Sequence, residues 1–170
     1  YSSIVGYRAK LELIMRPDGS IVAKIPGSPV DIPLITLVRA LGLESDKDIA
    51  NAVSLNETIQ DELEPSFEKI GEITTSRDSI VYISKRIAPG MLEEFQIKRA
   101  ETLLDWGLLP HLGKNPDNRH EKALFLGEAA SKLIELRLGW IYTDDKDHYG
   151  NKVIKFAGQM LADLFRTAFR

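Results

Sequence analysis

Residues 120–138 carry the longest uninterrupted helical pattern of the chain. Apolar side chains recur along this stretch at helical spacing and form a broad stripe: Leu124, Leu126, Ala130, Leu133, Ile134 and Leu138. Gly139 follows, and glycine readily takes the left-handed conformation that ends many helices. Because so wide an apolar face has to be covered, we expect a central core helix here.

Composition limits what can surround this helix. The chain has 170 residues, 44% of them hydrophobic and 28% charged, which is typical of one globular domain with or without a small appendage. It contains no cysteine, which excludes disulfides, thiolate zinc sites and cysteine nucleophiles. The absence of cysteine also agrees with a cytoplasmic location. No apolar run reaches the roughly 18 residues of a membrane-spanning helix, so we expect no membrane contact.

The N-terminal part of the sequence predicts a β-hairpin over residues 4–25. Two stretches rich in β-formers, residues 4–16 and 20–25, flank Pro17-Asp18-Gly19, whose residue types suit a tight turn. An isolated hairpin is marginally stable in water, so one of its faces is expected to pack on helices.

Helical patterns fill residues 31–139, the predicted helical body. The first helix is expected to begin at Asp31-Ile32-Pro33, with Asp31 as its cap and Pro33 in its first turn. Further helices are expected at residues 46–53, 56–63, 76–87 and 91–107. The fold class predicted is therefore α+β, a mainly α-helical domain with an N-terminal β-hairpin.

The tryptophans and their neighbours give an expectation about the core. Leu92, Phe95, Leu103 and Trp106 follow one another at helical spacing within residues 91–107. Such a stripe is typical of a buried face, so we expect Trp106 in the core. Trp140, just beyond a helix end, is also expected there rather than on a stacking surface. Lys98 and Arg99 are expected on a solvated helix face, where they are able to meet phosphate.

Residues 144–152, with the sequence DDKDHYGNK, crowd ionisable side chains between two helical patterns. A calcium loop of the EF-hand type is excluded, because counting from Asp145 places Tyr149 at the fifth position and Phe156 at the twelfth, where oxygen ligands belong. Paired carboxylates also serve acid–base chemistry. A stand-alone metal-dependent hydrolase using Asp144, Asp145, Asp147 and His148 is therefore one alternative, although no phosphate loop or nucleophile motif accompanies them.

For Asp144 and Asp145 we favour a structural role. Short acidic side chains readily accept hydrogen bonds from turn amides, and Lys146, Lys152 and Lys155 are close in sequence. Asp147 and Lys152 suit a different role. Aspartate accepts from amino groups on base edges, and lysine donates to base acceptors or phosphates. This loop is thus able to touch nucleic acid, although a net charge of −3 is unusual for a free-standing nucleic-acid binder.

Three segments together resemble a known family. Residues 144–166, DDKDHYGNKVIKFAGQMLADLFR, match an Asp-Asp-x-Asp-His-(aromatic or Leu)-Gly-Asn-(Lys/Arg) motif, followed by a helix with a small-residue pair, here Ala157-Gly158. Residues 31–43, DIPLITLVRALGL, and 122–139, KALFLGEAASKLIELRLG, agree with segments upstream of that motif. The chain resembles the second-largest subunit of multisubunit DNA-directed RNA polymerase, in particular its archaeal and eukaryotic forms.

The resemblance implies the lobe domain of that subunit, a module of transcription that forms one side of the downstream DNA cleft. In this family the active-site Mg²⁺ is held by an NADFDGD motif on the largest subunit. That motif is absent from this sequence. The resemblance thus implies a fragment with no catalytic residue, metal site or cofactor of its own, within a nucleotidyltransferase that carries Mg²⁺ elsewhere.

The resemblance also assigns DNA-facing positions. In bacterial members the third aspartate of the motif and a following arginine help to contact a base of the non-template strand. The matching positions here are Asp147 and Lys152, with His148 and Asn151 as neighbours. Lys152-Val153 stands where bacterial members carry two arginines, and lysine lacks the bidentate fork of arginine. What the resemblance implies for this loop is a general DNA-facing role.

Taken over the whole chain, residues 1–170 are expected to be a fragment of a longer polypeptide, because Arg170 lies within a helical run that has no stop signal. The expected parts are the hairpin at 4–25, the helical body at 31–139, an acidic DNA-facing loop at 140–158 and a terminal helix at 159–170. The implied partners are other polymerase subunits, downstream and non-template DNA, and initiation, elongation or cleavage factors. The remaining alternative is a protein-interaction module whose acid loop never meets DNA.

Overall fold

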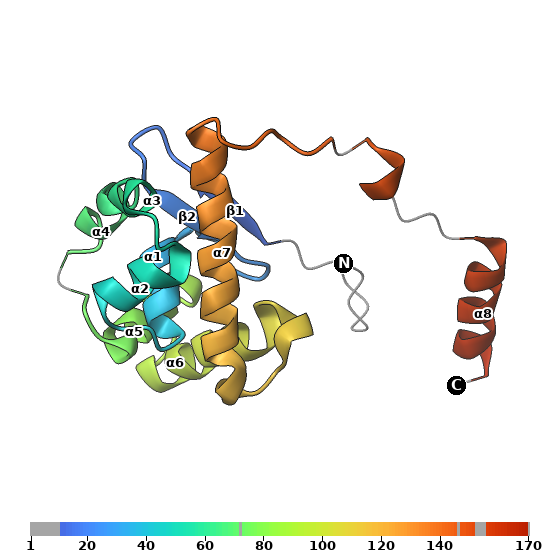
Figure 1. Cartoon of the computed structure of the whole chain (residues 1–170). Coiled ribbons are helices and arrows are strands. Elements are labelled where there is room, and N and C mark those ends of the chain that lie inside the picture. The colour runs from blue at the N-terminus through green and yellow to red at the C-terminus, as the bar shows by residue number, and fades with distance from the viewer. Residues whose placement is uncertain (1–10, 72, 146, 152–155, 170) are drawn as a thin grey trace.

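The computed structural model describes residues 11–71, 73–145, 147–151 and 156–169. Within them, a small sheet and a set of helices form one body, from which the last helix stands apart (Figure 1). The predicted fold class is confirmed: the domain is α+β and mainly helical, with an N-terminal antiparallel sheet.

The sheet contains three short antiparallel strands in the order β1-β2-β3. They are β1 Glu12–Met15, β2 Ile21–Lys24 and β3 Ile32–Pro33. Leu13 pairs with Ala23, which in turn pairs with Ile32. The predicted turn joins β1 to β2, and Gly19 has φ of +86°, a conformation that favours glycine. The part of the predicted hairpin that falls on residues 1–10 lies outside the described residues.

β3 corrects the expected start of the first helix. Helix α1 runs from Leu34–Ala40, Pro33 is its N-cap residue, and no side chain caps it, so Asp31 does not have the predicted capping role. Ile32 is instead fully buried and paired with β2. A residue before proline is biased toward extended backbone, which explains why Ile32 joins the sheet.

Helix α1 is the most enclosed element of the body, because all seven of its residues are buried. It is followed by α2 Asp46–Val53, α3 Glu57–Asp61 and α4 Glu64–Glu68. α2 has the predicted bounds. Asn56 caps α3 by accepting a hydrogen bond from the backbone N of Thr58 at 3.0 Å. The helix predicted at 56–63 is thus shorter, and α4 follows it with Pro65 in its first turn, where proline is tolerated.

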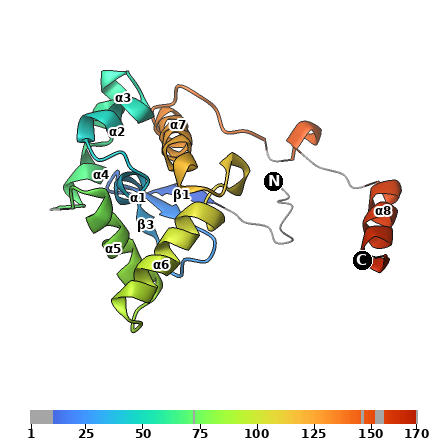
Figure 2. The ribbon, with the colours of Figure 1, turned by 90° about the horizontal axis from the view of Figure 1, so that it is seen from below.

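The second half of the body contains α5 Ser76–Ile87, α6 Glu93–Thr102 and α7 Arg119–Arg137. α5 has the predicted bounds, and its cap is Thr75, whose side chain accepts from the backbone N of Asp78. A π-helical turn, η1 Leu103–Gly107, extends α6, and two short 3-10 turns, η2 Pro110–Leu112 and η3 Pro116–Asn118, lead into α7. Figure 2 shows α5 and α6 side by side along one edge of the body.

α7 confirms the long helix predicted at 120–138, although its stripe is only partly buried. Leu126, Ala130 and Ile134 are fully buried, whereas Leu124 remains 43% exposed. α7 crosses α2 at Gly127, where an added Cβ would lie 2.4 Å from the carbonyl oxygen of Ala52. Glycine at this position therefore sets how closely the two helices approach.

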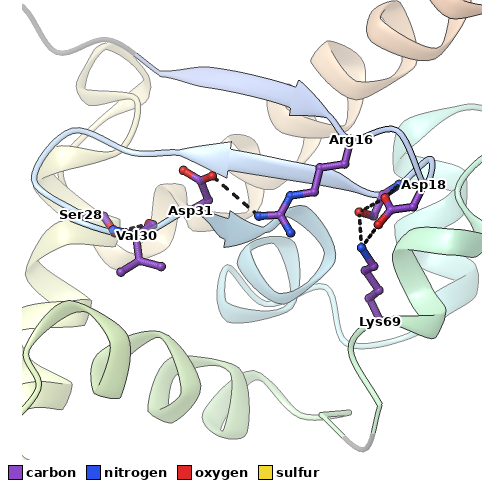
Figure 3. Close-up of polar contacts among 7 residues, drawn as sticks. Arg16, Asp18, Ser28, Val30, Asp31 and Lys69 are labelled. Atoms are coloured by element: carbon purple, nitrogen blue, oxygen red, sulfur yellow. Dashed lines mark hydrogen bonds and ion pairs between the residues drawn. The ribbon is translucent and has the colours of Figure 1, made fainter.

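Ion pairs connect the sheet to its surroundings (Figure 3). The Asp18 carboxylate in the hairpin turn pairs with Lys69, which follows α4, and also accepts from the Ser20 hydroxyl at 2.6 Å. The hydrogen bond from Lys69 is the largest cause of a pKa well below the usual range for Asp18. Arg16 approaches Asp31 at 3.8 Å across the sheet. Near the start of β3, the Ser28 hydroxyl donates to the Val30 carbonyl at 2.7 Å.

The last helix, α8 Ala157–Ala168, stands away from the body in both views (Figures 1 and 2). It begins two residues before the expected terminal helix at 159–170, and the apolar residues of its sequence pattern all lie in solvent. Their exposed fractions exceed one half: Met160, Leu161, Leu164 and Phe165. Phe165 and Phe169 stack on each other with ring centroids 5.9 Å apart.

Candidate functional site

The segment that carries the acid motif leaves the body at the C-terminal end of α7. Gly139, with φ of +74°, donates to the Leu136 carbonyl at 3.1 Å, and Trp140 donates to the Glu135 carbonyl at 2.9 Å. These two bonds form a Schellman motif, which satisfies carbonyls of the last helical turn. The chain is thereby turned out of the helix direction, and Trp140 is 51% exposed, so its predicted place in the core is wrong.

We define the acid turn as residues 144–151. Its described part is organised by hydrogen bonds between near neighbours. The Asp145 Oδ1 atom accepts from the Asp147 backbone N at 2.9 Å, and the Asp145 carbonyl accepts from the His148 N at 3.2 Å. His148 Nδ1 in turn accepts from the Gly150 N at 3.1 Å, next to the 3-10 turn η4 Tyr149–Asn151. Asp145 thus bonds a turn amide, which is the interaction suggested for it by the sequence.

The acid turn lies on the surface. Asp144, Asp145, Asp147 and His148 are all exposed, and Tyr149 is 84% exposed. Asp144 lies near Lys132 of α7, whose pKa is raised chiefly by its hydrogen bond to Glu128 and to a lesser degree by Asp144. Lys152 falls outside the described residues, so its predicted partnership with Asp147 remains a prediction.

The geometry does not assemble a metal centre from these acids. In the part of the chain that the structure describes, no three histidine, aspartate or glutamate side chains come close enough to hold a metal ion. The same residues contain no helix long and apolar enough to cross a membrane.

Beside the acid turn lies an apolar groove of about 1020 Å³. Its walls come from β1, from the η2 region and from the outer side of α7, for example Leu13, Leu109 and Leu133. Ile141 and Asp144 form part of its rim, so the segment leading to the acid turn also borders the groove. The sequence did not predict this hollow, because its walls meet only when the hairpin packs across α7.

A buried charged cluster supports the π-helical turn η1. Asp105 accepts two hydrogen bonds from the Arg119 guanidinium, at 2.6 and 2.7 Å. Lys122, with no exposed surface, donates to the carbonyls of Leu104 and Asp105 at 3.0 and 2.7 Å. Burial lowers the pKa of Lys122, whereas the hydrogen bond to Asp105 raises the pKa of Arg119. The sequence analysis did not predict this cluster. The one signal it offered was Lys122, a lysine on the apolar side of the predicted long helix.

The second predicted core tryptophan is also on the surface. Trp106 is 59% exposed, and Leu92 and Phe95, from the same predicted stripe, are 73% and 56% exposed. The predicted place of Trp106 in the core is therefore wrong, and of this stripe Leu103 packs against the core while partly buried. The buried side chains of α6 and η1 are Gln96, Ala100 and Leu104, which recur every four residues, and Asp105.

Comparison with known sequences identifies the family. The model of the family described as RNA polymerase Rpb2, domain 2, matches residues 2–155. The chain belongs to this family, which confirms the resemblance stated above.

Relatives in archaea agree over almost the whole chain. DNA-directed RNA polymerase subunit Rpo2 of Saccharolobus shibatae is 44% identical over 99% of this chain, and subunit Rpo2N of Methanococcus vannielii is 42% identical over the same share. Subunit Rpo2N of Halobacterium salinarum is 37% identical. The chain spans 15% of the length of the first relative and 34% and 33% of the other two.

Proposed function

We propose that this chain works as the lobe domain in the second subunit of an archaeal-type DNA-directed RNA polymerase and forms one side of the downstream DNA cleft. The observation that carries this proposal is the family match over residues 2–155, together with more than 40% identity to archaeal polymerase subunits over 99% of the chain. In this role the domain shapes the downstream DNA cleft and contacts DNA and other proteins during transcription. We place it in the archaeal cytoplasm.

The proposal assigns the chemistry to other parts of the polymerase. Nucleotide joining and its Mg²⁺ belong to the assembled enzyme, with the ion held by the largest subunit. The partners of this domain are then the other subunits, the downstream and non-template DNA, and transcription factors.

Within this role, Asp147 of the acid turn and Lys152, which follows the turn, face DNA, with His148 and Asn151 beside them. The exposure of Asp147 and His148 supports this assignment, because a DNA-facing side chain has to be accessible. The hydrogen bonds among Asp145, Asp147 and His148 also define the local backbone. Since the net charge is −3, contacts made by this domain alone are weak and sensitive to salt.

Site-specific crosslinking in the assembled polymerase tests the DNA-facing role. A photoreactive amino acid replaces Asp147 or Lys152 in turn, and the complex is irradiated on a DNA template. The matched control positions are Asp48 and Lys47, an acidic and a basic residue that are both exposed on α2. We expect DNA adducts from positions 147 and 152 well above those from 47 and 48. Equal yields from all four positions would contradict the DNA-facing role.

A second candidate function is a protein-interaction module whose acid turn never meets DNA. The apolar groove of about 1020 Å³ favours this alternative, because such hollows commonly receive apolar groups of a partner. The same crosslinking experiment separates the two functions. Protein adducts at 147 and 152 without DNA adducts would favour the interaction module.

A further inference from the structure

The outer side of α6 and η1 exposes large apolar side chains next to two cations. We call this region the Trp106 surface, and it consists of Met91, Leu92, Phe95, Lys98, Arg99 and Trp106. Figure 2 shows α6 at the edge of the body. Tryptophan, arginine, phenylalanine and methionine are the residue types enriched in protein interfaces, and tryptophan and arginine dominate binding hot spots.

The π-helical turn explains how Trp106 comes to the surface. The backbone N of Leu108 donates to the Leu103 carbonyl at 2.8 Å, which is a bond between residues five apart. Leu104 is fully buried and Lys122 holds its carbonyl, so the inner side of the turn is fixed. Trp106 projects on the outer side, where its ring lies 5.0 Å from Lys114 Nζ. A bulky aromatic side chain is thus presented by a well-supported backbone.

A hollow of about 700 Å³ adjoins Trp106. Aliphatic groups of Pro26, Ile87 and Leu103 line it, and Lys98 and Arg99 are the charged residues in its lining. No carboxylate takes part in that lining among the described residues. The hollow therefore combines an apolar floor with a positive rim, and it is complementary to an apolar group that is flanked by negative charge.

We propose that the Trp106 surface docks a protein segment that carries an apolar anchor side chain between carboxylates. The anchor enters the hollow against Ile87, Leu103 and Trp106, and the carboxylates pair with Lys98 and Arg99. Leu92 and Phe95 extend the apolar contact along α6. This inference deepens the factor-docking part of the proposed function and rests on it, because it specifies where a partner binds and with which chemistry.

A protein partner fits the surface better than a nucleic-acid strand does. A strand-binding groove needs a row of cations that follows successive phosphates. Here Lys98 and Arg99 line one hollow, and Lys114 lies 5.0 Å from the Trp106 ring. Among the other members, Met91, Leu92 and Phe95 offer no hydrogen-bond donor side chain to a phosphate, and Trp106 offers a single indole N–H. Apolar area of this kind is matched by apolar side chains of a partner.

Fluorescence binding tests the inference on the chain itself. The chain has two tryptophans, so a Trp140→Phe background leaves Trp106 as the only tryptophan, and excitation beyond the absorption of tyrosine selects its emission. The probe is a short synthetic peptide with one phenylalanine between glutamates, and a second peptide has lysine in place of each glutamate. We expect a saturable change of Trp106 emission with the glutamate peptide. Lys98→Glu and Arg99→Glu should each weaken binding about tenfold.

The matched control is Lys47→Glu, which makes the same charge change on exposed α2 and should leave the dissociation constant unchanged. Circular dichroism of each variant checks that the fold is kept. Equal binding of the lysine peptide, the absence of saturable binding, or tighter binding of an oligothymidine strand than of the glutamate peptide would each overturn the inference. Because the assay contains neither polymerase nor template, its failure is distinct from failure of the crosslinking test.

Discussion

Lys122 is a charged side chain with no contact to solvent. It lies on the buried side of α7, where the helical pattern otherwise places apolar residues. It is kept there by the carbonyls of Leu104 and Asp105, which accept its two hydrogen bonds. A π-helical turn leaves carbonyl groups without their usual α-helical partners, and a buried carbonyl without a partner is costly. Lys122 therefore stabilises the very turn that presents Trp106.

Replacing Lys122 with methionine should lower the free energy of unfolding by about 3 kcal/mol, because two buried carbonyls lose their charged donor. Urea denaturation followed by circular dichroism measures this change. The matched control is Lys132→Met on the same helix, where the lysine is exposed and bonded to Glu128, and there we expect a change below about 0.5 kcal/mol. Similar losses in both variants would argue against the capping role of Lys122.

The pH dependence of stability gives a separate prediction for Lys122. Burial lowers its pKa below the ordinary value of 10.5, so the folded protein releases this proton at a lower pH than the unfolded chain does. Between the two pKa values the unfolded state binds more protons, and the contribution of Lys122 to stability rises with pH. The stability difference between wild type and Lys122→Met should thus grow as the pH rises toward 10.5, the ordinary pKa of the lysine side chain. A difference that stays constant would contradict this.

At the scale of elements, the approach of α7 to α2 depends on Gly127. A Cβ atom there would lie 2.4 Å from the Ala52 carbonyl oxygen, which belongs to backbone and cannot simply rotate away. Gly127→Ala should therefore destabilise the body by about 2 kcal/mol, despite the better helix propensity of alanine. Thermal or urea unfolding measures the effect.

Gly158 of α8 offers the matched control for this substitution, because it is also a helical glycine and an added Cβ would meet nothing within 4 Å. Gly158→Ala should leave unfolding of the body unchanged and raise the helix content of α8, since alanine favours the helix by about 1 kcal/mol. Destabilisation by both substitutions would contradict the proposed steric cause.

Several elements were predictable from the sequence because their signals are local. α2 and α5 have the predicted bounds, and the turn at Pro17-Asp18-Gly19 lies where its residue types require it. β3 was not predictable in this way. Two residues form that strand only because β2 is beside them, and such a neighbour is invisible in a local pattern.

The candidate site shows the same division. The residue types of residues 144–152 drew attention to this segment, and residues 144, 145 and 147–150 are indeed exposed and form a hydrogen-bonded turn. The Trp106 surface was misjudged, because helical spacing at Leu92, Phe95 and Trp106 indicates an apolar face without telling whether the covering partner lies in the same chain. Here the buried face of α6 is the neighbouring one.

At the scale of the whole molecule, α8 is the element least tied to the rest. Its described residues are all exposed, and Figures 1 and 2 show it apart from the body. Deleting residues 156–170 should therefore change the free energy of unfolding of the body by less than about 0.5 kcal/mol. It should also reduce self-association, because the exposed apolar face of α8 is removed. Urea denaturation and sedimentation velocity measure the two effects.

The loss of stability from truncating a core side chain gives a reference value for this experiment. Leu104 is fully buried, and Leu104→Ala should cost about 3 kcal/mol. If deletion of α8 destabilised the body as strongly as Leu104→Ala, α8 would have to pack on the body in solution.

By itself, the sequence determined the α+β class, most helix positions, the hairpin turn and the family, since these follow from residue types at fixed spacings along one stretch of chain. Only the tertiary structure decided which apolar faces are covered. It enclosed α1 completely, placed Lys122 under a π-helical turn, left Trp106 and Trp140 at the surface and opened the groove beside the acid turn. A side chain becomes buried when a segment far away in the sequence packs on it. The periodicity of one segment does not say which other segment packs there.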